Sequence, residues 1–100
     1  MKLRIQHDTI RIRLSELEVQ EFGKGNSLVS RTHFPQADLE FRLMPNSKER
    51  VVFENGKVEI TVPEEKISDW AASDQITIAM EISVSNDKKL SILVEKDMKL

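Results

Sequence analysis

The sequence predicts a mainly β domain with two short helices, in which a β-β-α-β-β unit occurs twice and the two units form one barrel with pseudo-twofold symmetry. Apolar and polar residues alternate in short runs, a helix-start signal follows the second run of each half, and the two halves match at an offset of 48 residues. A chain of 100 residues suits one hydrophobic core. We therefore expect a single domain over 1–100, with repeat one at 1–44 and repeat two at 49–97.

The first half begins with two alternating runs joined by a turn at His7-Asp8. Ser15 and Glu18 have the spacing of a capping box and predict a short helix directly afterwards. Gly23 and Gly25 are suited to end this helix. Its expected buried side is Leu17, Val19 and Phe22. A β run over 27–34, a turn at 35–37 and a strand with Leu39, Phe41 and Leu43 follow, and 44–47 is expected to be a connection.

The second half repeats this order. Asn55-Gly56 is a strong hairpin signal between two alternating runs. Pro63 suits the first position of a second helix, in which Ile67 and Trp70 are expected to face the interior. Alternation over 76–84, a turn at 86–89 and alternation over 90–94 predict a final hairpin.

Matched apolar positions support the duplication. At an offset of 48 the pairs are Leu3/Val51, Ile5/Phe53, Ile10/Val58, Ile12/Ile60, Leu14/Val62, Val19/Ile67, Phe22/Trp70 and Leu28/Ile76. In the last hairpin the offset is 51, which predicts a three-residue insertion in the second copy.

Composition limits the classes of function. The chain has no cysteine, which excludes disulfides and thiolate sites, and no apolar run long enough to span a bilayer. With no signal-peptide pattern at its start, we expect a cytoplasmic protein. Residues 1–48 carry eight Lys/Arg against six Asp/Glu, whereas 49–100 carry seven against eleven, so a basic patch is expected in the first half.

The second half resembles the AbrB/MazE swapped-hairpin family. The resemblance is carried by 55–63, by Ile67 and Trp70, by 73–76 and by the alternation at 90–92. It implies that two units interleave into a barrel, here within one chain as a pseudo-dimer, and that basic side chains of this barrel bind DNA. The two ends, 1–15 and 90–97, are also similar to a small bacterial family of unknown function.

The first hairpin carries the candidate site. A two-residue turn at His7-Asp8 places Lys2 opposite Arg13 and Arg4 opposite Arg11 on the outer face, and directly opposed like charges are unfavourable unless something compensates them. Lys2, Arg4, Arg11 and Arg13 are therefore the candidate anion- or DNA-binding residues. The alternative is a solvated face, or one neutralised within the fold by carboxylates such as Glu16, Glu18 or Glu40.

Other chemistry has less support in the sequence. His7 and His33 lack metal-ligand spacing, and no nucleophile motif is present, so we expect no metal, no cofactor, no small-molecule substrate and no enzymatic activity. The predicted function is a non-enzymatic binding domain, such as an AbrB-like DNA-binding regulator or antitoxin-like component. The alternative is a protein-interaction or structural module without a nucleic-acid role, whose partner would be an acidic protein surface.

Overall fold

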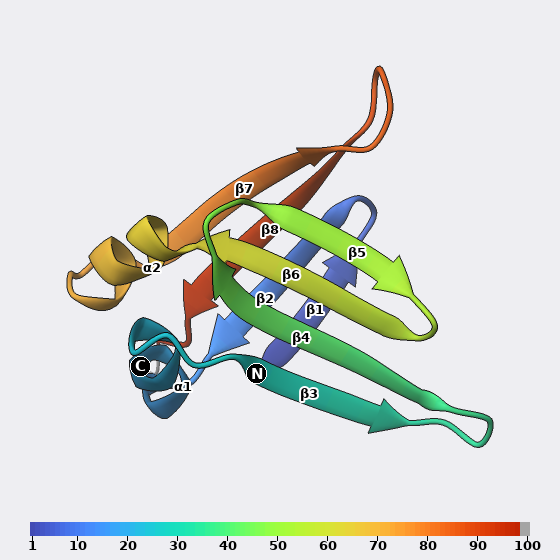
Figure 1. Ribbon diagram of the computed structural model, residues 1–100, viewed down its shortest axis with the longest axis horizontal. Coiled ribbons are helices and arrows are strands. Elements are labelled where there is room, and N and C mark those ends of the chain that lie inside the picture. Colours follow the sequence, from blue (N-terminus) through green and yellow to red (C-terminus); the bar gives the residue numbers. More distant parts are fainter. Residues whose placement is uncertain (99–100) are drawn as a thin grey trace.

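The computed structural model describes residues 1–98, and the last two residues of the predicted domain lie outside the described part. Residues 1–98 form eight strands and two helices in the order β-β-α-β-β, β-β-α-β-β, as the sequence predicts (Figure 1). The first half contains β1 (Lys2–Gln6), β2 (Thr9–Leu14), α1 (Glu16–Gly23), β3 (Leu28–His33) and β4 (Asp38–Asn46). The second contains β5 (Arg50–Glu54), β6 (Lys57–Pro63), α2 (Glu64–Ala71), β7 (Thr77–Ser83) and β8 (Lys89–Lys96).

The two halves exchange hairpins. One sheet, sheet A, has the strand order β1-β2-β8-β7, and the other, sheet B, has the order β3-β4-β6-β5. Each sheet thus combines the first hairpin of one half with the second hairpin of the other, and a parallel pair, β2 with β8 or β4 with β6, joins them. Thr9 pairs with Ser91 just as Lys57 pairs with Glu40, which agrees with the offsets of 48 and 51.

The register corrects one matched pair. Leu28 lies opposite Leu43 in β3–β4, and Ile78, not Ile76, has the equivalent position opposite Val94 in β7–β8. Ile78 is buried whereas Ile76 is 43% exposed. The inserted residues therefore divide between the segment after α2 and the turn before β8. Alternation alone did not locate them, because a shift by two residues keeps the same face of a strand.

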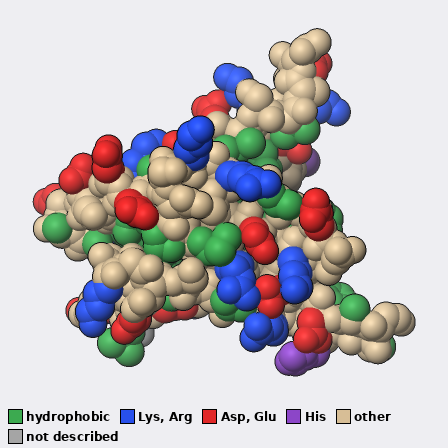
Figure 2. Space-filling model, viewed as in Figure 1, with side chains coloured by type: hydrophobic (Ala, Val, Ile, Leu, Met, Phe, Trp, Pro, Cys, Tyr) green, Lys and Arg blue, Asp and Glu red, His purple; other side chains and the backbone are tan. Residues whose placement is uncertain are grey.

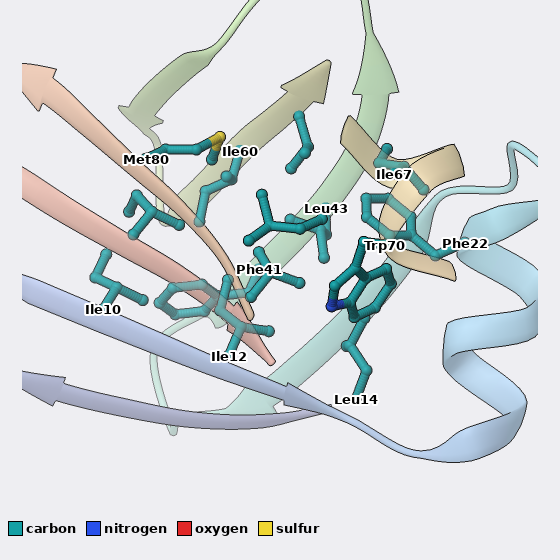
Figure 3. Close-up of a cluster of buried hydrophobic side chains, with 14 of the residues drawn as sticks. Ile10, Ile12, Leu14, Phe22, Phe41, Leu43, Ile60, Ile67, Trp70 and Met80 are labelled. Atoms are coloured by element: carbon teal, nitrogen blue, oxygen red, sulfur yellow. The ribbon is translucent and has the colours of Figure 1, made fainter. Parts of the chain in front are cut away.

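The inner faces of the two sheets and one side of each helix form a single core (Figure 3). Phe22 from α1 and Trp70 from α2 meet edge to face with ring centroids 6.4 Å apart. The indole Nε1–H of Trp70 donates to the Ile76 carbonyl over 2.8 Å, which satisfies its polar atom inside the core. The helices therefore close one end of the space between the sheets, as Figure 1 shows.

The predicted barrel is not closed within the described residues, because the strands belong to two separate four-stranded sheets. Ile5 on β1 and Phe53 on β5 show the consequence, since their registers place them on the inner faces but they are 60% and 70% exposed. Strand pairing therefore leaves the edges of both sheets open.

Three local expectations were wrong. Leu17 is 73% exposed, because α1 turns Phe22 and, partly, Val19 toward the core instead. Pro45, expected in a connection, belongs to β4 and pairs with Val62 beyond the end of β3, where β4 has only one neighbour and a missing N–H costs little. Pro63 ends β6 and occupies the N-cap position of α2, without a capping hydrogen bond from its side chain, instead of the first helical position.

Candidate functional site

The four predicted cations of the first hairpin lie opposite one another in the register that the two-residue turn predicts. Lys2 lies opposite Arg13 and Arg4 opposite Arg11, on the face of sheet A that points away from the core. Lys2, Arg4 and Arg13 are exposed and Arg11 is partly buried. Four long cationic side chains thus share two neighbouring strands on the outer face.

Two of the four cations form ion pairs within the fold. Lys2 Nζ lies 3.0 Å from Asp97 Oδ2, and Arg11 Nε lies 2.9 Å from Glu95 Oε1. Glu95 comes from β8, the parallel neighbour of β2, and Asp97 directly follows that strand. These carboxylates offset the repulsion across the hairpin, so the face is partly neutralised by the second half of the chain.

Arg4 and Arg13 form no ion pair within residues 1–98. A fifth cation on this face, Lys89, lies 3.6 Å from Glu81 of β7. The outward-facing positions on the strands of sheet A therefore carry five cations and two carboxylates, and Asp97 lies beside them. The excess positive charge is concentrated on the first hairpin at Arg4 and Arg13.

The suggested neutralising residues Glu18 and Glu40 have other partners. Both carboxylate oxygens of Glu18 accept hydrogen bonds from the Met1 ammonium, at 2.8 and 2.9 Å, and Oε1 also accepts from the Ser15 N–H in the predicted capping box. Burial opposes ionisation of Glu18, but these hydrogen bonds outweigh it and hold its pKa below the ordinary value.

Glu40 lies on the outer face of sheet B, not sheet A. Its side chain is buried between Arg31, 3.0 Å away, and Arg42, 3.3 Å away. Burial again opposes ionisation, and hydrogen bonds from Arg42 and Arg31 hold the pKa of Glu40 below its ordinary value. Glu40 therefore cannot neutralise the first hairpin.

The equivalent hairpin in sheet B serves as an internal comparison. The positions of Lys2, Arg4, Arg11 and Arg13 correspond there to Arg50, Val52, Glu59 and Thr61. Figure 2 views this side of the molecule and shows Lys and Arg interspersed with Asp and Glu over the strands of sheet B. The basic face is therefore particular to the first hairpin and does not follow from the repeated architecture.

A polar depression of about 380 Å³ lies beside the two opposed arginines, and its lining consists of Arg4, Gln6, His7, Thr9 and Arg11. His7 occupies the left-handed region at φ 51° in the turn between the strands. Guanidinium groups donate several hydrogen bonds in a planar fork that matches phosphate and carboxylate oxygens. This arrangement is suited to hold an anion on the surface.

The two histidines lie in different hairpins. His33 Nδ1 lies 2.7 Å from Asp38 Oδ1 across the β3–β4 hairpin, far along the chain from His7. Residues 1–98 contain no group of three or more His, Asp or Glu side chains placed to hold a metal ion. Neither helix has the length and apolar character needed to cross a membrane, a finding that covers the same residues.

Sequence reasoning missed the two carboxylates that matter most for the basic face, Glu95 and Asp97. The alternation of Leu90, Ile92 and Val94 already placed Glu95 on the outer face of its strand. Which strand lies next to β8 was not readable from the pattern, because a parallel pairing between distant segments leaves no local signal.

The fold and this surface define a small β-rich domain of two exchanged-hairpin sheets with one basic outer face. The model of a family of unknown function, DUF7009, matches residues 1–100, and the chain belongs to this family. No curated protein and no solved structure matches the chain significantly.

Proposed function

We propose that this protein is a non-enzymatic binding domain whose outer face on sheet A binds the phosphate backbone of DNA. The observation that carries the proposal is the pair of exposed arginines, Arg4 and Arg13, which form no ion pair within the described residues although they lie on the hairpin with the greatest positive charge. Phosphate oxygens would supply the opposite charge that, among the four cations of the first hairpin, the fold gives to Lys2 and Arg11 but not to Arg4 and Arg13.

The exchange of hairpins between the two halves adds support. It is the arrangement expected of an AbrB-like pseudo-dimer, in which basic side chains of the barrel contact DNA. The carboxylates of Glu95 and Asp97 would reduce the number of phosphates bound, since they already occupy two of the four cations. We therefore expect weak binding without strong sequence preference.

The experiment is a titration of duplex binding at increasing salt concentration. Binding is monitored by the fluorescence anisotropy of a labelled duplex of arbitrary sequence. The logarithm of the binding constant should fall against the logarithm of salt concentration with a slope of about −2 if only two cations contact phosphates, and about −4 if all four do. The variant Arg4→Glu/Arg13→Glu should abolish binding. The matched control Lys48→Glu/Lys57→Glu makes the same charge change outside this face and should retain most of it.

Absence of binding at low salt would refute the proposal, and so would equal losses in the two double variants. A protein-interaction module is the second candidate, favoured by exposed apolar side chains near all four hairpin turns. These are Ile5, Phe34, Phe53 and Val84, each at least 55% exposed. That candidate predicts no response to duplex at any salt concentration.

A further inference from the structure

β5 is an edge strand of sheet B that pairs with β6 on one side only. The two-residue turn at Asn55-Gly56 makes Glu54 and Lys57 a hydrogen-bonded pair, so Arg50, Val52 and Glu54 direct their backbone N–H and C=O groups toward β6. Val51 and Phe53 consequently direct theirs toward the free edge. This edge offers backbone donors and acceptors to another strand.

The side chains of β5 are self-complementary in one antiparallel register. When a second β5 is placed with Val52 opposite Val52, Arg50 lies opposite Glu54 and Val51 opposite Phe53, each pair occurring twice. In this register Val51 and Phe53 are the hydrogen-bonded pair, which agrees with the direction of their free backbone groups. Charge, apolar contact and backbone bonding thus favour the same alignment.

The charged and aromatic side chains in this alignment lack the partner that a second copy would supply. Arg50 and Glu54 are exposed and form no ion pair within residues 1–98. Phe53 is 70% exposed although its register places it on the inner face of the sheet. A second strand would cover the ring with Val51 and give both charges an opposite neighbour.

The other edge strands are less suited to pair with themselves. On β1, the equivalent register places Arg4 opposite Arg4, and the cations of this strand protect its edge. On β3, Arg31 would lie opposite either itself or Val29, and on β7, Glu81 would lie opposite Ala79 when Met80 is central. Among the four sheet edges of the described chain, β5 alone combines apolar and ionic complementarity.

We infer that the β5 edge is a self-association surface, on which two copies of this chain pair antiparallel about Val52 and join their B sheets into one eight-stranded sheet. The contact is short and buries little area, so the dimer forms weakly and depends on protein concentration. The basic face lies on the other sheet, so this inference stands whether or not the protein binds DNA.

Sedimentation equilibrium of the full chain over a wide range of protein concentration tests this inference. Arg50→Glu or Glu54→Arg alone places like charges opposite each other at both ends of the pairing and should raise the dimer dissociation constant about tenfold. The double exchange Arg50→Glu/Glu54→Arg restores opposite charges and should recover dimer formation. Lys88→Glu, a charge reversal at an exposed residue in the turn before β8, should have no effect.

Phe53→Pro provides a second test that leaves the β5–β6 hydrogen bonds intact. It removes the N–H that Phe53 directs toward the second copy and should give a monomer with an unchanged far-ultraviolet circular dichroism spectrum. A monomer at every concentration of the wild-type protein would overturn the inference. A dimer that is insensitive to both single charge reversals would also overturn it.

Discussion

The contact between the two helices offers a sharp test of how the halves fit together. Gly23 at the end of α1 and Ala71 at the end of α2 hold equivalent positions in the repeat and face each other where the helices approach. A Cβ atom added at Gly23 would lie 2.9 Å from the Cβ of Ala71. That is closer than two carbon atoms approach without a shift of the backbone.

Two effects of opposite sign determine the stability of Gly23→Ala. Replacing glycine by alanine in a helix gains at most about 1 kcal/mol of propensity. Overpacking of a tight contact costs about 1–3 kcal/mol. The clash involves a short side chain that cannot rotate away, so we expect the steric cost to exceed the gain in propensity and the variant to lose about 1 kcal/mol of stability.

Urea unfolding, monitored by Trp70 fluorescence, measures this loss, because the Trp70 ring on α2 packs against Phe22 on α1 in the helix contact. The exchange variant Gly23→Ala/Ala71→Gly moves the methyl group to the other helix and should be more stable than Gly23→Ala. A variant Gly23→Ala as stable as the wild-type protein would refute the steric reasoning. So would a double exchange that recovers nothing, since then the loss would not arise at this contact.

Two further predictions concern polar groups of the fold. Glu18→Gln removes the ion pair with the Met1 ammonium and should cost about 1 kcal/mol at pH 7. Because folding lowers the pKa of Glu18, its contribution is complete above the ordinary value of 4.5 and is lost as pH falls through the lowered pKa, so urea unfolding curves of wild type and variant should converge in acid. Convergence at neutral pH instead would contradict this. Trp70→Phe removes the hydrogen bond to the Ile76 carbonyl and leaves a cavity in the core. Thermal unfolding should show that the free energy of unfolding falls by about 2 kcal/mol. An unchanged unfolding midpoint would argue against the packing of this end of the core.

Local pattern was sufficient for much of this structure. Alternation at Leu3, Ile5, Ile10 and Ile12 determined which side chains face inward, and the turn at His7-Asp8 determined the register that opposes Arg4 to Arg11. Strand period and turn length act over a few residues, so they are readable without knowledge of the rest of the chain. The capping box at Ser15 is predictable for the same reason.

Tertiary structure decided what neutralises the basic face and where the sheets end. Glu95 and Asp97 reach the first hairpin only because β8, from the opposite end of the chain, pairs parallel with β2. The same long-range pairing leaves β1 and β5 as open edges and exposes Ile5 and Phe53, which alternation had assigned to the interior. Parallel pairing between distant segments depends on how the whole chain packs, and no short stretch of sequence encodes it.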